Sequence, residues 1–573
     1  MALLNDQINT PNSAEDYLTL GQEEKVKRNY AAAYASFVLG IEALPADSWA
    51  LEYTLTLALY ESAAHAALRS GKLAEQVSYA NAVLQNATTL LDTVTTHCTI
   101  CQAYEAQGQY LEAIKHALPL IQQLGVDFPK QPEPETDFKQ GLLEINRLLA
   151  GRTPASLADL PLMTDQRFIA AMKLMAEIAS PTLMVLPGFT PLLMTKQVQT
   201  SLQYGNSPES ILGYVSYGQI LGSMSGNIDK GHEFGTLALA LIEQLDARHL
   251  KSYATMGVFA TIKPWSAHVQ ETLSPLFEAY FYGIEVGNHV TASACVLWFC
   301  SYAYLIGREL PELEPLLEDY SNAIAGMERE SEHDMSNIVH QAVLNLSGLS
   351  EQTTRLEGTA YRESERLARH QETGDQVTLC IFYLHKVMLC TLFGQHEQAV
   401  EFSKMAEKHL ASVGGLLYEA LFYFYDALAR LALFSAKDRA GDAFYSVAVQ
   451  RKTQKIIHFN QRKMKKWATH APMNFQHKWD LVEAEFQHHV KGDKLAAMAH
   501  YDHAIDAAKA QGYVQEEALA NELAAQFYAR WGKTTIARAY MLQARDAYAR
   551  WGAVAKVQAL EQEQAELLAE RID

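Results

Sequence analysis

One short segment of the chain has the residues of a phosphate-binding loop. Gly532–Thr535 has the sequence GKTT. In a phosphate-binding loop a second glycine stands five residues earlier, so that backbone N–H groups and the lysine can hold the phosphates after a strand. That earlier position is Phe527, which lies in a helical segment. The segment therefore predicts a tight turn between two helices, and no nucleotide site is expected.

Two cysteines have the spacing of a redox pair or of half a zinc site. Cys98 and Cys101 form the motif CTIC, and His97 precedes it. A structural zinc site needs a second pair of ligands at a matching spacing, and no second CxxC pair is present. Cys101 also occupies a position at which a helical hairpin needs a small residue. The motif therefore predicts buried structural thiols.

The chain contains 20 histidines, including the neighbours His488 and His489 and the pair His333 and His340, which share one helix face. No HExxH motif is present, so the sequence predicts no metal site. It also lacks the GxSxG motif of a serine nucleophile. We therefore assign no catalytic, cofactor-binding or metal-binding residue and expect no enzyme activity.

A run of basic residues stands out in this acidic chain. Arg451, Lys452 and Lys455 precede a second cluster, and the aromatic residues Phe459 and Trp467 flank that cluster. The run could contact an acidic partner, a phosphate or a nucleic acid, or it could be a solvated helix face. Of the binding readings we favour the acidic surface of a partner domain. The candidate partner-binding residues are Trp265, Arg462, Lys463, Lys465, Lys466 and Trp467.

Trp265 follows a proline in the segment KPWSAHV, at a predicted helix start. It either lines a concave surface or belongs to the core.

These residues lie among internal repeats. Residues 492–512 and 532–552 each begin with Gly, have Ala at the fifth and twelfth following positions, and end with Gly at the twentieth. Repeats at intervals of about 20–50 residues are typical of solenoids. Near the N-terminus, further residues have the spacing of a tetratricopeptide (TPR) unit: Tyr17, Leu20, Gly21, Tyr30, Ala33, Phe37, Gly40 and Pro45. We predict an all-α, TPR-like α-solenoid, a right-handed superhelix of helical hairpins.

Composition narrows the possible partners. The 573 residues have a net charge of −19, with 47 basic and 66 acidic side chains. Such a chain is a poor general binder of nucleic acids or anionic membranes. The N-terminus has no signal-peptide pattern. The most apolar stretch, 181–194, is broken by Pro187 and Pro191 and is too short to span a bilayer. We expect a cytoplasmic protein that binds neither nucleic acid nor membrane.

Breaks in the repeat pattern predict five segments. Proline-rich stretches interrupt the array at 128–137 and between 151 and 208, and a weaker, more polar division lies between Ser331 and Asp375. The predicted segments are a flexible N-terminal tail (1–14), N-terminal TPR-like repeats (15–127), a Pro-rich acidic linker with a helix (128–150), a central irregular helical-repeat region (151–345), and C-terminal TPR-like repeats with a capping helix (346–573).

Several long stretches resemble one family, in the same order along nearly the whole chain. The family comprises large multidomain bacterial signalling proteins, in which a serine/threonine kinase domain, an AAA-type predicted ATPase, a TPR-like helical region, a GAF domain and often a sensor histidine kinase follow one another. The resemblance is to the helical region, and nothing here is similar to the catalytic motifs. The stretches include DLPLMTDQRFIAAMKLM (159–175), QYGNSPESILGYVSYGQILG (203–222), GHEFGTLALALIEQL (231–245), KPWSAHVQETLSPLFEAYFYGIEVGN (263–288), NQRKMKKWATHAPMNFQHKWDLVEAE (460–485) and residues 518–561.

The resemblance implies a non-catalytic regulatory or scaffold module of bacterial signal transduction. Such a module would bind a partner or effector on the concave face of its superhelix, and the expected partner is a kinase, an ATPase or a GAF-containing signalling protein. Two alternatives stay open. The chain could be the helical sensor portion of an ATP-dependent kinase or ATPase whose catalytic domains are absent from it, or it could be a small-molecule-sensing array. The sequence does not determine the oligomeric state.

Overall fold

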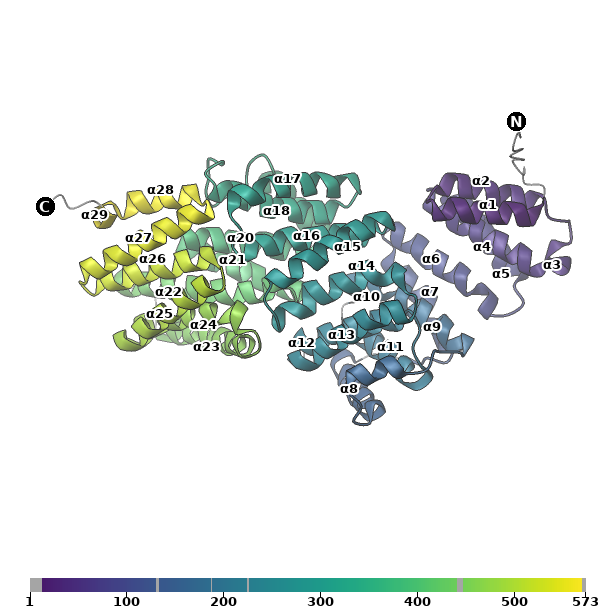
Figure 1. Ribbon diagram of the computed structural model, residues 1–573, viewed down its shortest axis with the longest axis horizontal. Helices are drawn as coiled ribbons and strands as arrows, with labels where there is room; N and C mark the ends of the chain where they lie inside the picture. Colours follow the sequence, from purple (N-terminus) through teal and green to yellow (C-terminus); the bar gives the residue numbers. More distant parts are fainter. Residues whose placement is uncertain (1–12, 130–132, 187, 224–225, 441–446, 569–573) are drawn as a thin grey trace, which may run out of the picture. The chain divides into compact units, whose positions relative to one another are not determined.

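The computed structural model describes residues 13–129, 133–186, 188–223, 226–440 and 447–568. These residues form helices and no β-strand, with only two isolated bridges, Leu162 with Asn206 and Glu357 with Arg362. The prediction of an all-α fold is confirmed. The chain divides into two compact units (Figure 1). Unit 1 comprises residues 1–217 and 240–247, and unit 2 comprises residues 218–239 and 248–573.

Unit 1 consists of short antiparallel hairpins, followed by a less regular region. Its helices are α1 (Ala14–Val26), α2 (Tyr30–Glu42), α3 (Ser48–Leu51), α4 (Tyr53–Arg69), α5 (Leu73–Asn86), η1 (Leu91–Thr93), α6 (Val94–Ala106), α7 (Tyr110–Gln123), α8 (Pro134–Leu149), η2 (Pro154–Asp159), α9 (Gln166–Glu177), α10 (Ala179–Val185) and α11 (Thr190–Tyr204). The division between the units passes through α12 (Ser210–Ser223) and α13 (Ile228–Gln244).

The first hairpin shows how the TPR residues act. The hydroxyl of Ser13 accepts a hydrogen bond from the Asp16 backbone, and the Asp16 carboxylate accepts one from the Ser13 backbone, so a capping box starts α1. Phe37 of α2 is fully buried, and its ring lies where any side chain at Gly21 would stand. The missing side chain lets the two helices approach closely. The predicted hairpin is therefore confirmed.

Unit 2 continues with longer hairpins. Its helices are η3 (Arg248–Leu250), α14 (Lys251–Gly257), η4 (Val258–Ile262), η5 (Lys263–Trp265), α15 (Gln270–Glu285), α16 (His289–Leu305), α17 (Leu310–Gly326), α18 (Glu330–Leu346), α19 (Glu363–Thr373), α20 (Gln376–Leu392), α21 (His396–His409), η6 (Leu410–Val413), α22 (Leu417–Ala440), α23 (Val447–His470), α24 (Pro472–Phe486), η7 (Gln487–Lys491), α25 (Lys494–Ala510), α26 (Val514–Arg530), α27 (Thr534–Trp551), α28 (Val554–Glu563) and α29 (Ala565–Leu568).

The C-terminal repeats form the hairpins that their spacing predicts. The four marker glycines lie between helices with positive φ, at 70° for Gly492, 78° for Gly512, 79° for Gly532 and 90° for Gly552. Glycine adopts this left-handed conformation without a steric penalty, so it ends a helix. The marker alanines, which let α25 and α27 pack closely, are at most 1% exposed: Ala497, Ala504, Ala537 and Ala544.

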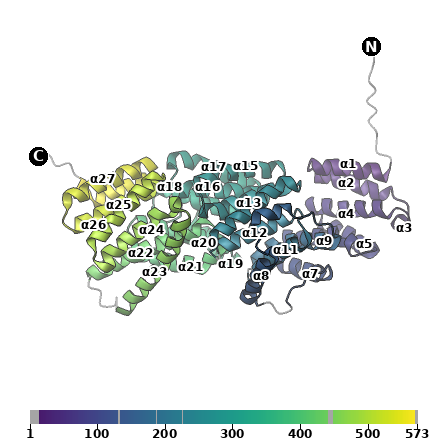
Figure 2. The same cartoon turned by 60° about the horizontal axis from the view of Figure 1, so that its bottom comes forward.

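The hairpins of unit 2 form two layers. Successive even-numbered helices contact one another from α16 to α26, while α15, α17, α21, α25 and α27 each pair with one of them on the outside. Figure 2 shows α22, α23 and α24 together, and all three contact one another. One continuous hydrophobic cluster runs from Ile228 to Ala553 through this unit. Unit 1 has separate clusters around Phe37 and around Met172.

Some predicted boundaries fall outside the described residues or stay untested. Residues 1–12 of the predicted tail, residues 130–132 of the predicted linker and the last five residues of the chain are not described, but α1 begins at Ala14 and α8 at Pro134. The division into two units does not test the boundaries of the five predicted segments, which stay a prediction. By length and composition the stretch Gln166–Val185 could cross a membrane, and half of it is buried inside unit 1.

Candidate partner-binding site

The inner layer of unit 2 is filled by the chain itself. Tyr304 of α16 stacks near His385 of α20 and Trp551 of α27, with ring centroids 5.8 and 6.2 Å apart. The side-chain amide of Gln515 donates a hydrogen bond of 2.8 Å to the Leu305 carbonyl, 210 residues away. Helices α16, α20, α22 and α26 are buried on nearly every face. A partner of unit 2 therefore has more room on the outer layer than between the inner helices.

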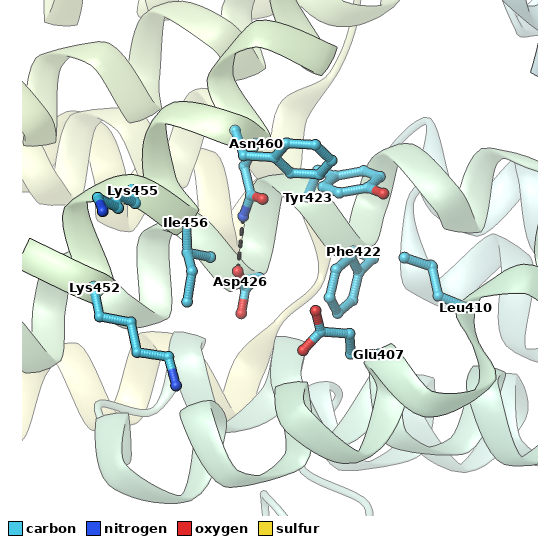
Figure 3. A pocket seen from close by; sticks show the side chains of 10 residues that line it. Glu407, Leu410, Phe422, Tyr423, Asp426, Lys452, Lys455, Ile456 and Asn460 are labelled. Atoms are coloured by element: carbon cyan, nitrogen blue, oxygen red, sulfur yellow. Dashed lines mark hydrogen bonds between the residues drawn. The ribbon is translucent and has the colours of Figure 1, made fainter. Parts of the chain in front are cut away.

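A pocket of about 250 Å³ lies between α21, η6, α22 and α23, where the inner helix α22 meets its neighbours. Figure 3 shows Asp426 and Asn460 at its centre, with Phe422, Leu410 and Glu407 on one side and Lys452, Lys455 and Ile456 on the other. The full lining is Glu407, Leu410, Phe422, Tyr423, Asp426, Lys452, Lys455, Ile456, Phe459 and Asn460. Apolar and aromatic surface thus lies next to charges of both signs.

A hydrogen-bonded network holds the polar centre of the pocket. The Asp426 carboxylate, 1% exposed, accepts two bonds from Arg430 Nε, at 2.7 and 2.8 Å. Asn460 Nδ2 donates to the same carboxylate at 2.7 Å, and so does the hydroxyl of Ser403. A buried charge needs such partners, because leaving it unpaired costs several kcal/mol, on the order of 3–5. Asp426 therefore fixes α21, α22 and α23 relative to one another, and the pocket is preformed.

Helix α23 makes the rim of the pocket basic. Seven Lys and Arg side chains and no Asp or Glu occur between Val447 and His470. Lys452 and Lys455 are exposed, and they form no ion pair with another described residue. Phe459, 46% exposed, adds an apolar surface beside them. The rim therefore offers free ammonium groups next to an aromatic ring.

The two predicted tryptophans lie together in the core of unit 2. The ring centroids of Trp265 and Trp467 are 5.0 Å apart, and Phe475 stacks on Trp265 at 5.4 Å. Trp265 is 4% exposed and its Nε1 donates to the Gly415 carbonyl at 2.8 Å, while Trp467 is 7% exposed. Trp265 was expected to line a concave surface or to belong to the core, and the structure places it in the core. That either indole contacts a partner stays a prediction, and their burial does not support it.

The predicted basic residues of α23 occupy different surroundings. Lys463 Nζ pairs with Glu419 at 3.2 Å and lies 4.9 Å from the Tyr423 ring centroid. Burial lowers the pKa of Lys463, but Glu419 and Tyr423 outweigh it and the net pKa is raised. Arg462 and Lys465 are exposed over the rings of Phe459 and Trp479.

The ammonium of Lys466 lies against Gly226. Of the four basic residues, Lys463 and Arg462 lie over the lining residues Tyr423 and Phe459.

Two other sequence expectations can be compared with the structure. Gly532 and Lys533 of GKTT lie in the turn before α27, which begins at Thr534, and Phe527 lies inside α26 at 1% exposure, so the predicted inter-helix turn is confirmed. Cys98 and Cys101 are both free thiols, the first half-buried and the second buried. Burial raises the pKa of Cys101 to about 12, which keeps its thiol protonated at neutral pH.

Sequence reasoning missed the polar centre of the pocket. Asp426 and Arg430 are four residues apart inside the aromatic and apolar helix α22. A charged pair at this spacing in an otherwise buried helix indicates a polar network, because buried charges are rarely left alone. That signal could have directed attention to Asp426. Its partner Asn460 and the rim residue Glu407 carry no comparable signal.

No family model and no curated protein matches this chain. Three solved structures are similar over nearly the whole length. The APC/C hetero-tetramer Cut9–Hcn1 has 13% identity and a TM-score of 0.35 and covers 96% of both chains. Yeast Tom70 has 12% identity and a TM-score of 0.20, also with 96% of both chains covered. The human IFIT1 dimer with m7Gppp-AAAA has 12% identity and a TM-score of 0.21, covering 98% of this chain and 96% of that one. At these scores the fold assignment rests on the hairpins themselves.

Proposed function

We propose that this chain is a non-catalytic regulatory or scaffold module of bacterial signal transduction, and that it binds an acidic segment of a protein partner at the α21–α23 pocket. The observation that carries the proposal is α23, a helix with seven basic and no acidic residues in a chain of net charge −19. It stands beside a preformed pocket with an aromatic wall. Opposite charges on two partners speed their encounter and set their orientation.

The pocket also restricts the size and chemistry of the side chains in the bound segment. Its volume of about 250 Å³ is at or below the lower end of small-molecule sites, which begin at about 300 Å³. A single apolar side chain fits such a space, with Phe422 and Ile456 as its walls. Carboxylates on the neighbouring residues of the segment would meet Lys452 and Lys455. The proposed ligand is therefore an apolar anchor flanked by acidic residues.

We propose further that the partner is a cytoplasmic kinase, ATPase or GAF-containing signalling protein. This identity rests on the resemblance of residues 159–175, 460–485 and 518–561 to the helical region of multidomain signalling proteins. In those proteins such domains share one polypeptide with the helical region.

The test is capture of partners from a bacterial lysate by the wild-type chain and by the charge-reversed variant Lys452→Glu/Lys455→Glu. Two exposed ion pairs are worth about 1–2 kcal/mol together, so reversal should weaken capture by about 5- to 30-fold at low salt. The matched control is Lys139→Glu/Lys509→Glu, which changes the net charge equally at two exposed lysines elsewhere. A signalling protein that is retained by the control and lost by the pocket variant supports the proposal. If the wild type, the pocket variant and the control recover the partner equally, the pocket is not the binding site.

Sensing of a small molecule is the second candidate, because the pocket is preformed and polar at its centre. A ligand that binds only the native state raises stability by RT ln(1 + [L]/Kd), about 2.7 kcal/mol at 100-fold excess over Kd. A metabolite screen by thermal unfolding separates the two functions. A metabolite-dependent shift that Asp426→Asn abolishes would favour sensing, and its absence would favour the protein partner.

A further inference from the structure

Three potential metal ligands meet where α24 passes into η7. Glu485, His488 and His489 each offer one donor atom, and these atoms all lie within 4.8 Å of one another. The three residues are spaced i, i+3 and i+4, so they occupy one face of the helix. The closest pair, Glu485 Oε2 and His489 Nε2, is 3.2 Å apart. Tetrahedral zinc with bonds of about 2.0–2.1 Å separates its ligand atoms by about 3.3 Å.

The backbone at this point is unusual. Residues Gln487–Lys491 form a π-helical turn, which ends at Gly492 with a φ of 70°. Single π-helical turns are rare and occur frequently at functional sites, because they reposition the side chains that they carry. Both histidines belong to this turn, whereas Glu485 belongs to the last turn of α24. The irregular turn therefore coincides with the ligand cluster.

Glu485 is a buried carboxylate that a hydrogen bond holds in place. It is 4% exposed, and the hydroxyl of Tyr501 on α25 donates a hydrogen bond to its Oε1. Tyr501 therefore orients the carboxylate through this hydrogen bond, as the residues behind a metal site orient its ligands.

His488 has a buried nitrogen without a hydrogen-bond partner in the described chain. Its Nδ1 is buried and has no hydrogen-bond partner among the described residues. The ring stacks on that of His489, with centroids 4.0 Å apart, and meets Phe527 of α26 edge-on at 4.9 Å. A buried polar atom without a partner is destabilising, and a bound ion would supply the missing partner.

We propose that Glu485, His488 and His489 bind a divalent first-row transition metal, with Zn²⁺ as the ion that the donor set suits best. Two imidazole nitrogens and one carboxylate oxygen are borderline ligands that favour zinc over magnesium or calcium. Three protein ligands leave a fourth position for water. The bound ion would join α24 and η7 to α25 through Tyr501.

Arg530 now supplies the positive charge at this position. Its Nη1 lies 3.2 Å from His489 Nε2, and its Nη2 donates to Gln526 at 3.3 Å. The side chain is exposed, so it can swing into solvent. A dication and the guanidinium repel each other at this distance. Metal binding must therefore displace Arg530 from His489, and Arg530 limits the affinity.

The experiment is a titration of the full chain, without a histidine tag, with Zn²⁺ by calorimetry and with Co²⁺ by visible absorption. Co²⁺ reports its ligand geometry through its d–d bands, which a purely structural role of these residues would not produce. The variants are His488→Gln/His489→Gln, Glu485→Gln and Arg530→Gln. The matched control is His503→Gln, which removes an exposed histidine outside the cluster. Thermal unfolding without metal checks that each variant folds. If Glu485→Gln does not fold, the zinc affinity of His488→Gln/His489→Gln alone tests the proposal.

We expect one site per chain in the wild type and in His503→Gln. Its affinity should fall at least 10-fold in Glu485→Gln, the site should be lost with the Co²⁺ bands in the histidine pair, and its affinity should rise in Arg530→Gln. Zinc binding of equal affinity in the wild type and in His488→Gln/His489→Gln would overturn the proposal. So would a wild type that binds no Co²⁺ while Arg530→Gln also binds none.

Discussion

A buried ionic cluster inside unit 2 provides the sharpest test of the packing described above. Lys478 Nζ of α24 lies 2.6 Å from Glu516 Oε2 of α26 and 3.0 Å from His477 Nε2, and it donates to the Asn474 carbonyl at 3.1 Å. The ammonium also stands 4.3 Å from the ring centroid of Tyr513. Burial lowers the pKa of Lys478, and Glu516 opposes that shift.

The perturbation is Lys478→Met, which keeps the length of the side chain and removes its charge. At 2.6 Å and an effective dielectric constant of about 20, the attraction between Lys478 and Glu516 is about 6 kcal/mol. Part of it is offset by the cost of burying both groups. Breaking a buried pair by removing one partner costs about 3–5 kcal/mol, because the other charge is left uncompensated. We expect unit 2 to lose this much stability.

The double variant Lys478→Met/Glu516→Gln should be milder than the sum of its parts. It buries no unpaired charge from this pair, and replacing a buried pair with neutral groups is often close to neutral. We expect a coupling energy of at least about 2 kcal/mol from the double-mutant cycle.

The assay is urea unfolding followed by tryptophan fluorescence. Six of the seven tryptophans belong to unit 2, so the signal reports mainly on that unit: Trp265, Trp298, Trp467, Trp479, Trp531 and Trp551. The control is Lys509→Met on the exposed face of α25. The buried pair does not exist as described if Lys478→Met lowers the free energy of unfolding no more than this control. The same holds if the losses of the two single variants simply add up in the double variant.

Three further predictions follow from single residues. Burial lowers the pKa of His385 to about 4 from an ordinary value of about 6.5, so its contribution to stability is full above pH 6.5 and is lost as pH falls toward 4. We expect unit 2 to lose about 2 kcal/mol from this residue between pH 7 and pH 5, and His385→Gln should reduce that loss; an identical pH profile in the variant would contradict it. Gly21→Ala should destabilise unit 1 by about 1–3 kcal/mol, because its methyl group would overlap the ring of Phe37; circular dichroism of thermal unfolding measures this, and an unchanged first transition would show that the hairpin can open. Trp265→Phe should cost at least about 1–3 kcal/mol in urea unfolding, because the Gly415 carbonyl loses its buried donor; a cost near zero would mean that water replaces the indole.

Much of the local architecture could be predicted from spacing alone. Gly492, Gly512, Gly532 and Gly552 all lie between helices at positive φ, where only glycine is free of strain. The alanines between them face a neighbouring helix, because side chains three, four and seven apart share one face.

The candidate site was only partly predictable. The basic run of α23 is visible in the sequence, and it borders the pocket through Lys452 and Lys455. Asp426, which organises the pocket centre, was missed, since among 66 acids only its spacing of four from Arg430 in an otherwise apolar helix marks it. The tryptophans were candidates for a binding surface because exposed and buried aromatic residues look alike in a sequence. Their mutual contact shows that they belong to the core.

The sequence by itself determined the helices, their ends and the pairing of neighbours into hairpins. These features depend on residues within about 40 positions of one another, where helix period and glycine conformation act directly. Only the tertiary structure decided that Trp265 meets Trp467, that Gln515 bonds to Leu305, and that Glu485 is buried while Arg530 contacts His489. Contacts across about 200 residues depend on the summed small rotations between successive hairpins. No single residue encodes that sum, so the filled interior and the pocket become visible only in the folded chain, whereas Glu485, His488 and His489 share a helix face by their spacing alone.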